Sequence, residues 1–381
     1  MDVPSVAQMR AAAQSLAGHI VATPVQPWHG PALEERLGAA SQLILKLELF
    51  QRTGTFKLRA AMLNVLALSA EERRHGVTAV SAGNHAIAVA CAAQRGRVSA
   101  KVVMLGTASA LRVAAARAYG AQVVISTDGR TAFALADEIR AAERRTFIHP
   151  FDGRNVVLGT SGVGIEFLDQ VPDLDAMVVA IGGGGLMAGI AAAVKQIKPS
   201  CLVFGVEPIG ADVMSRSFRA AAPQRMERVD TIADSLAPPM TTQGTYDLCR
   251  RFVDDIVTVS DDAICAALAL LCGEAKLVVE PAGAAAAAAV LGPLAARHRA
   301  FVTIEENATI GGAGSGVCEL LAAEGLQLPL LQLGIPDRFI EHGSRESCLR
   351  AAGLDLAGLS ASVERWWALQ TQERLRSVSS V

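Results

Sequence analysis

Short apolar runs rich in β-branched residues alternate with longer alanine-rich stretches along nearly the whole chain. The short runs are typical of strands in a parallel sheet, and the alanine-rich stretches favour helices. Strands are predicted at Val77–Val80, Ala100–Leu105, Gln122–Ser126, Ala176–Ile181, Leu202–Val206 and Phe301–Ile304. Helices are predicted at Ala86–Arg95, Ala108–Tyr119, Thr131–Arg144, Leu186–Gln196 and Asp261–Leu271. This alternation indicates an α/β fold in which helices cover parallel sheets.

One region lacks the alternation. Between Arg216 and Thr245 the chain carries Pro223, Pro238 and Pro239 and shows neither strand-like runs nor helix-like stretches. Long segments without regular structure inside a compact domain are usually functional, so this segment is predicted to be a long loop over a site.

Composition narrows the class of protein. The chain has 381 residues, of which 51% are hydrophobic and 19% charged, enough for a large core and two or three domains. A net charge of −2 and an aromatic content of 4% argue against a nucleic-acid partner. The seven cysteines form no C-x-x-C pair, which is typical of a reducing compartment. No secretory signal or membrane span is visible, so we expect a soluble cytoplasmic protein with no membrane partner.

The segment before Lys57 carries the first candidate chemistry. A strand-like run, Leu43–Leu49, leads into a turn over residues 53–55, and Lys57 follows at the start of a helix-compatible segment. Because the free amides at a helix N-terminus disfavour a cation, the Lys57 amine is expected to lose its proton readily, as Schiff-base chemistry requires. The alternative is an ordinary solvated lysine on a first helical turn.

A second candidate is the turn Ser81-Ala82-Gly83-Asn84-His85, which follows a predicted strand and opens a helix. Backbone amides at such a turn can hold a carboxylate. Asn84 can donate to an oxygen of a ligand, and Ser81 can transfer a proton. Ser, Asn and Gly are also common turn and cap residues, which is the alternative interpretation.

The third candidate is the glycine run Gly182-Gly183-Gly184-Gly185, followed by Leu186. Several amides close together at a helix start form a phosphate cradle. The same residues, together with Ala188 and Glu207 about 20 positions on, also satisfy a dinucleotide-binding pattern, although no hydride-transfer site is visible nearby. Glu207 is an alternative metal ligand.

Together these three motifs resemble the fold-type II (tryptophan synthase β-like) pyridoxal-phosphate enzymes, most closely the threonine/serine dehydratases. The resemblance covers about residues 5–300. Further stretches that match this family are Thr23-Pro24, Arg117–Ala121, His149–Asp152, Ile232–Asp234 and Val279–Gly283.

The resemblance implies a role for each motif. Lys57 would carry pyridoxal 5'-phosphate covalently and later remove the Cα proton of the substrate, with Phe56 packed beside the ring. Asn84 would bond the phenolic oxygen, and Gly182 to Gly185 with Leu186 would hold the phosphate. The substrate carboxylate would bind at Ser81, Ala82, Gly83, Asn84 and His85, and Ser81 is a further catalytic candidate. The implied reaction converts L-threonine or L-serine to a 2-oxo acid and ammonia.

Departures from the family sharpen the expectation. Ala82 stands where serine racemases carry a serine that acts on the opposite face of Cα, which favours dehydration over racemisation. Val213 replaces a usual carboxylate at the family's cation site, so no metal is expected. Ile87, Ser235 and Thr160 also depart from the family pattern and leave the preferred substrate open.

The last part of the chain, about residues 301–381, instead resembles the C-terminal end of 1-deoxy-D-xylulose-5-phosphate synthase, through Val302–Asn307, Gly311–Gly316 and Leu333–Asp337. The synthase's catalytic segments are absent. At this junction Glu305 falls at or beside the family's serine that bonds the pyridine nitrogen. The hypothesis is that its carboxylate keeps that nitrogen protonated; the alternative is a solvent-facing or helix-capping Glu305.

We therefore expect a small domain over residues 50–148 and a large cofactor-binding domain formed by residues 1–49 and 149–300. The tail of residues 301–381 is expected to complete the large domain or pack on it. A homodimer or homotetramer is expected, acting on a small amino acid. Two other functions stay open: a β-replacement lyase or synthase, and a protein that binds the cofactor without turnover.

Overall fold

The computed structural model describes residues 2–30, 33, 37, 41–127, 129–292, 301–308, 330–336, 340 and 343–366. The chain forms two compact units. The first contains residues 1–30 and 42–293, and the second contains residues 31–41 and 294–381. All of the candidate chemistry except Glu305 lies in the first unit.

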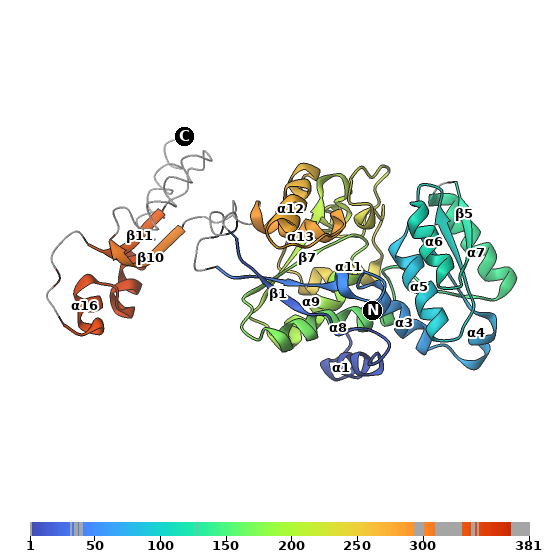
Figure 1. The fold of residues 1–381 in the computed structure, drawn as a ribbon, viewed down its shortest axis with the longest axis horizontal. Helices are drawn as coiled ribbons and strands as arrows, with labels where there is room; N and C mark the ends of the chain where they lie inside the picture. Colours follow the sequence, from blue (N-terminus) through green and yellow to red (C-terminus); the bar gives the residue numbers. More distant parts are fainter. Residues whose placement is uncertain are drawn as a thin grey trace. The chain divides into compact units, whose positions relative to one another are not determined.

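One sheet of the first unit has four parallel strands in the order β5-β4-β3-β6. The strands are β3 (Val77–Ser81), β4 (Ala100–Leu105), β5 (Gln122–Ser126) and β6 (Thr146–Phe147). The helices α3 (Lys57–Leu66), α4 (Ala70–His75), α5 (Asn84–Arg95), α6 (Ala110–Ala118) and α7 (Gly129–Glu143) gather around them (Figure 1). Helix α5 buries every residue from His85 to Ala93, because its small side chains allow close packing against the strands.

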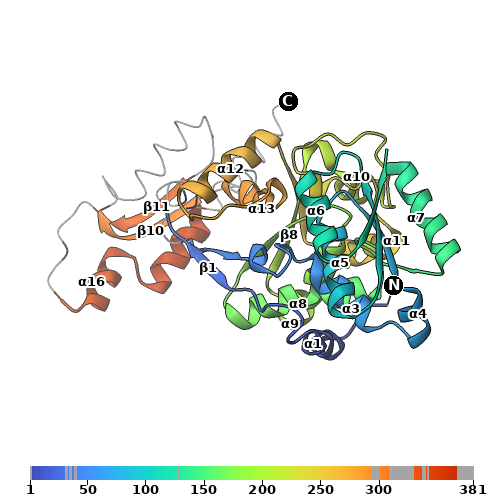
Figure 2. The same cartoon turned by 45° about the vertical axis from the view of Figure 1, so that its right-hand side comes forward.

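The other large sheet has three parallel strands in the order β7-β8-β9. These are β7 (Ala176–Ala180), β8 (Leu202–Pro208) and β9 (Asp255–Val259). Helices α8 and α9 pack closely together beside this sheet, with α12 and α13 near its other face (Figure 2). The helices of this part are α1 (Val6–Ser15), α8 (Arg154–Gln170), α9 (Gly185–Ile197), α10 (Val213–Ala220), α11 (Gln243–Phe252), α12 (Asp261–Gly273) and α13 (Pro281–Leu291).

Helix α3, which begins at Lys57, is fixed by a buried group of charges. The Arg59 side chain is 1% exposed and pairs with Glu48 at 2.7 Å and with Glu166, on α8, at 2.6 Å. Lys46 pairs with Glu166 at 3.1 Å. A buried guanidinium that contacts two carboxylates holds its neighbours in one geometry, because every lost contact leaves a buried charge unpaired. Gly159 of α8 adds a close approach, since a Cβ there would lie 2.7 Å from the Ala60 Cα atom.

The predicted α/β architecture with parallel sheets is confirmed. The strand predicted over Leu43–Leu49 is too long: β2 covers Leu43–Lys46, pairs antiparallel with β1 (Val25–Trp28), and is followed by the 3-10 turn η1 (Glu48–Phe50). The strand ends there because Glu48 turns inward to Arg59 and Thr23. The loop predicted between Arg216 and Thr245 is shorter than expected, because α10 extends to Ala220, α11 begins at Gln243 and η3 (Asp234–Leu236) lies between them.

The second unit contains β10 (Phe301–Ala308), which pairs in parallel with β11 (Leu330–Ile335), and helix α16 (Arg345–Ala352). Glu305 lies within β10, but its side chain is outside the described residues, so its role at the pyridine nitrogen stays a prediction. The glycine-rich segment Gly311–Gly316 also lies outside them. The proposed domain boundaries likewise stay predictions. Among the described helices, none is long and apolar enough to cross a membrane.

Candidate functional site

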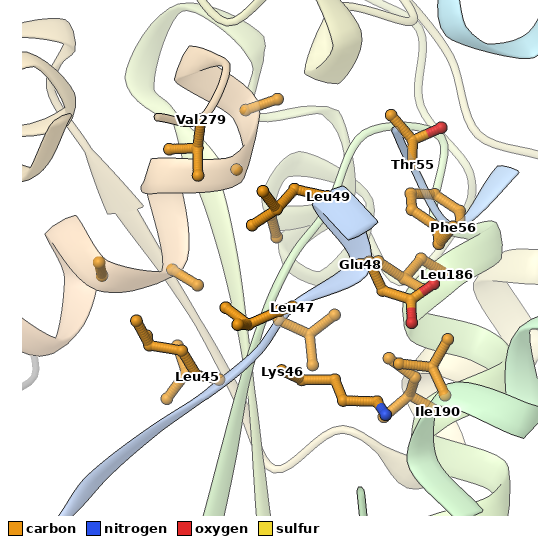
Figure 3. A pocket seen from close by; sticks show the side chains of 18 of the residues that line it. Leu45, Lys46, Leu47, Glu48, Leu49, Thr55, Phe56, Leu186, Ile190 and Val279 are labelled. Carbon is orange, nitrogen blue, oxygen red and sulfur yellow. The ribbon is translucent and has the colours of Figure 1, made fainter. Parts of the chain in front are cut away.

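A cavity of about 640 Å³ in the first unit brings together two of the three predicted motifs and part of the third. Its lining includes Lys57, Asn84 and the glycines Gly182 to Gly185. Figure 3 shows Thr55 and Phe56 at one end, near Leu186, while Leu45, Leu47 and Leu49 follow one wall and Val279, from the segment that precedes residue 281, lies opposite them. The cavity therefore has a polar end, where the candidate chemistry lies, and a long apolar part.

Lys57 is the first residue of α3 and is half-buried at the polar end of the cavity. Its Nζ atom donates to the Pro150 carbonyl at 2.7 Å and lies 5.1 Å from the centre of the Phe56 ring. Burial lowers the pKa of the Lys57 amine to about 8, although the carboxylate of Glu280 acts to raise it. A lysine with a lowered pKa in a cavity is poised for nucleophilic and base chemistry.

The glycine turn follows β7 and opens α9, with Gly184 in a left-handed conformation at φ +96°. A Cβ on Gly183 would lie 2.3 Å from the ring of Phe151, and one on Gly185 would lie 2.6 Å from the Phe151 carbonyl oxygen. Only glycine fits such a turn. The turn presents backbone amides at the positive end of α9, which is a binding site for an anion such as phosphate.

Two buried threonine hydroxyls line the same cavity as this turn. Thr53 Oγ1 and Thr55 Oγ1 line the cavity and have no hydrogen-bond partner among the described residues. Burying a hydroxyl without a partner is costly, so a polar ligand at this end of the cavity would satisfy both groups. A reactive amine, an anion-binding turn and two hydroxyls of this kind fit a ligand that carries an aldehyde and a phosphate.

The turn after β3 differs from the prediction in detail. Asn84 lines the cavity, whereas Ser81, Ala82, Gly83 and His85 are not part of its lining. Ser81 Oγ accepts a hydrogen bond from the Gly83 amide at 3.0 Å and so shapes the turn. The His85 ring is buried, its Nε2 atom is 2.9 Å from the Ile148 carbonyl oxygen, and burial lowers the pKa of His85 to about 3. His85 is therefore neutral near pH 7, and only its backbone amide is left to contact a ligand.

Asn84 meets groups that were not predicted to contact it. Its Nδ2 atom donates to Glu280 at 2.8 and 3.0 Å and to Ser235 Oγ at 3.1 Å. Arg112 of α6 donates to the same Glu280 at 3.1 Å and forms an ion pair with Asp234. Sequence reasoning missed Arg112 altogether. A signal was present, because Arg112 lies in the first turn of a helix, where a cation is unfavourable without acidic partners.

Glu207 has a structural environment. It is fully buried and accepts hydrogen bonds from the Met214 and Ser215 amides and from Ser215 Oγ, each at 2.7 Å. Burial raises its pKa to about 7. The carboxylate thus binds the first turn of α10. The described residues contain no group of three or more His, Cys, Asp or Glu side chains arranged for a metal.

Comparison with protein families identifies the family of this chain and its cofactor. Residues 16–304 match the family described as "Pyridoxal-phosphate dependent enzyme". The chain belongs to this family. The predicted cofactor, pyridoxal phosphate, is therefore confirmed, and the lysine, glycine turn and threonine hydroxyls described above suit it.

Within the pyridoxal-phosphate dependent enzymes, the chain is similar to several dehydratases and to a racemase. The chain is 54% identical to phenylserine dehydratase of Ralstonia pickettii, over 66% of this chain and 77% of that relative. It is 39% identical to the catabolic L-threonine dehydratase of Escherichia coli K12, over 66% and 76% of the two chains. The fold is similar to maize serine racemase, with a TM-score of 0.74 and 32% identity over 77% of this chain and 88% of that one. It is also similar to the T.th. threonine deaminase, with a TM-score of 0.67 and 40% identity over 76% and 93%. These neighbours confirm the predicted fold-type II architecture.

The end of the chain matches the model of a different family. Residues 286–359 match the family described as "Transketolase, C-terminal domain". The predicted junction between two unrelated parts near residue 300 is thereby supported at the family level. The more specific resemblance to 1-deoxy-D-xylulose-5-phosphate synthase stays a prediction.

Proposed function

We propose that this enzyme dehydrates and deaminates a β-hydroxy α-amino acid, giving a 2-oxo acid and ammonia. One observation carries the proposal: the half-buried Lys57 amine, whose pKa is lowered to about 8, lies in the same cavity as the glycine turn at the start of α9. The relatives whose names describe dehydratases support the same reaction type.

Each motif would hold one part of the bound molecules. Pyridoxal phosphate, when bound, supplies the electron sink that makes a Cα–H bond acidic. Lys57 would hold its aldehyde carbon, the amides of Gly182 to Gly185 its phosphate, and Asn84 its phenolic oxygen. The threonine hydroxyls at 53 and 55 would donate to it from the same end of the cavity.

The chain's own residues would then handle the substrate. The turn from Ser81 to His85, of which Asn84 lines the cavity, would receive its carboxylate, which fixes the Cα–H bond relative to Lys57. The Lys57 amine would take the Cα proton, which a neutral amine does well near pH 8. Because Ala82 has only a methyl group, it can move no proton on the opposite face of Cα, so elimination is favoured over racemisation.

For the substrate we propose 3-phenylserine ahead of L-threonine and L-serine, which the sequence alone ranked first. Support comes from the higher identity to phenylserine dehydratase, 54% against 39% for threonine dehydratase. The cavity also offers apolar surface for an aromatic ring, through Phe56, Phe151, Leu236, Pro238 and Val279. An aromatic side chain gains more from such a surface than a methyl group does.

A substrate panel tests the proposal. Purified enzyme saturated with pyridoxal phosphate is given threo-3-phenylserine, L-threonine or L-serine, and the 2-oxo acid and ammonia are measured. We expect the highest kcat/KM for phenylserine and equal amounts of both products. Higher kcat/KM for threonine would reject the aromatic preference but keep the reaction. A visible absorption band that no hydroxy amino acid alters would instead indicate cofactor binding without turnover, and product formation only with an added thiol would indicate β-replacement.

A further inference from the structure

A small group of charged side chains lies beside Asn84. Arg112 comes from α6, which belongs to the four-stranded sheet, whereas Asp234 lies in η3 and Glu280 directly precedes α13. The Arg112 guanidinium donates to Glu280 Oε2 at 3.1 Å and pairs with Asp234. Its side chain is about one-fifth exposed, so the ion pairs are partly shielded from water.

The Arg112 side chain lies against Gly83, in the turn that follows β3. A Cβ added to Gly83 would lie 2.4 Å from Arg112 Cδ, 2.8 Å from Nε and 3.0 Å from Nη1. The arginine side chain thus lies directly on the turn whose amides are proposed to receive the substrate carboxylate. Arg112 already contacts two carboxylates there, in the geometry that a guanidinium uses for any carboxylate.

We propose that Arg112 is a substrate-binding residue that exchanges one carboxylate for another. In the free enzyme it pairs with Asp234 and Glu280, and on binding it contacts the α-carboxylate of the amino acid at the turn from Ser81 to Gly83. Leaving the first partners costs little, because the Asp234 and Glu280 side chains are 52% and 31% exposed and water can replace the guanidinium there. This inference rests on the proposed function, since it concerns the same amino-acid substrate.

The exchange also affects Asn84. Its two amide hydrogens are shared among Glu280 and Ser235. When Arg112 leaves Glu280, the remaining contacts of that carboxylate are with Asn84, so Glu280 continues to orient the amide. The Glu280 carboxylate therefore connects binding of the substrate by Arg112 with the orientation of the Asn84 amide, which is proposed to face the cofactor.

The first test compares Arg112→Gln with the matched control Arg117→Gln, an exposed arginine on the same helix. Hydrogen bonds to a charged group contribute about 1.5–3 kcal/mol, so we expect KM for the preferred hydroxy amino acid to rise about 10- to 100-fold in Arg112→Gln, with kcat changed less than about threefold. Arg112→Lys should restore part of the affinity. The control should match the wild type. An unchanged KM in Arg112→Gln would overturn the proposal.

A second measurement isolates the carboxylate without turnover. Dissociation constants of L-alanine and L-alaninamide, neither of which has a β-leaving group, are taken from the change in the visible absorption band. The wild type should bind L-alanine more tightly than L-alaninamide. In Arg112→Gln the ratio of the two dissociation constants should fall towards one. A preference that survives in Arg112→Gln would show that the turn alone recognises the carboxylate, and so would contradict the proposal.

A third variant distinguishes exchange from a merely structural role. Asp234→Asn removes one competing carboxylate and should lower KM or leave it within about twofold, because Arg112 becomes more available to the substrate. If the ion pairs only hold the cavity together, Asp234→Asn and Arg112→Gln should raise KM together, which would overturn the proposal. Failure of the proposed function is distinct, since the wild type itself would then form no 2-oxo acid.

Discussion

Two turns of this enzyme occupy equivalent places after a strand and before a helix, and we propose that they bind their anions differently. Each follows a parallel strand and opens a helix: the turn after β3 leads into α5, and the turn after β7 leads into α9. The α9 turn is all glycine and excludes any side chain, since Cβ atoms at Gly183 and Gly185 would collide with Phe151. The α5 turn instead lies against a charged side chain, Arg112, which has two acidic partners.

The difference corresponds to the two ligands. A cofactor phosphate stays bound through many turnovers, and a rigid cradle of amides suits it because no group must move. A substrate carboxylate must enter and leave in every cycle, and a cation with alternative partners suits that exchange. On this proposal, the same strand–turn–helix unit would serve as a permanent site in one sheet and as an exchangeable site in the other.

The largest effect should come from breaking the permanent site. Gly183→Ala places a methyl carbon about 2.3 Å from the Phe151 ring, so the turn must distort and lose its amide geometry. We expect cofactor affinity to fall more than about 100-fold, measured by equilibrium dialysis of pyridoxal phosphate, because several charge-assisted hydrogen bonds weaken together. Gly273→Ala is the control, since a Cβ there meets nothing within 4 Å. Normal affinity in Gly183→Ala would refute the rigid-cradle account.

The next effect concerns the scaffold that holds both turns around one cavity. Arg59→Met leaves Glu48 and Glu166 without their buried partner and should lower the free energy of unfolding by about 3–5 kcal/mol, measured by urea denaturation. The matched control Arg10→Met removes an ion pair whose side chains are 48% and 52% exposed, and should cost about 0–1 kcal/mol. Equal losses in the two variants would mean that the buried group does not fix α3.

A smaller effect is expected from pH. The neutral Lys57 amine must attack the aldehyde of the cofactor, and its pKa of about 8 lies below the ordinary lysine value of 10.5. The rate of cofactor uptake by the apoenzyme should therefore rise with pH and level off above about 8, and at pH 7 it should be about tenfold below the plateau. Glu280 opposes this lowering, so Glu280→Gln should move the rising limb to lower pH. A rate of cofactor uptake that keeps rising up to about pH 10 would contradict the burial of Lys57.

The sequence predicted the local structure around the candidate site residues. Lys57, Asn84 and the glycine run each lie where an apolar strand meets a helix, and this alternation can be read within about ten residues. The ion pairs of Arg112 could not be predicted in this way. They join positions 122 and 168 residues apart, which only the folded chain brings together.

Orientation was also beyond the sequence. His85 was expected to help bind the substrate carboxylate, but its position on α5 directs the ring into the core, where the Ile148 carbonyl oxygen is its partner. Glu207 was considered as a metal ligand from its place after a strand, and the sequence did not show that it also accepts hydrogen bonds from the first amides of α10. A residue type limits the possible chemistry, and the direction of its side chain decides which possibility is realised.

The most direct test of the central claim is to identify the lysine that carries the cofactor. The enzyme with bound pyridoxal phosphate is reduced with sodium borohydride, digested, and examined by peptide mass spectrometry. We predict a pyridoxyl group on the peptide that contains Lys57, and its loss in Lys57→Ala. Labelling of a different lysine, such as Lys46, or a labelling pattern that Lys57→Ala leaves unchanged, would contradict the account.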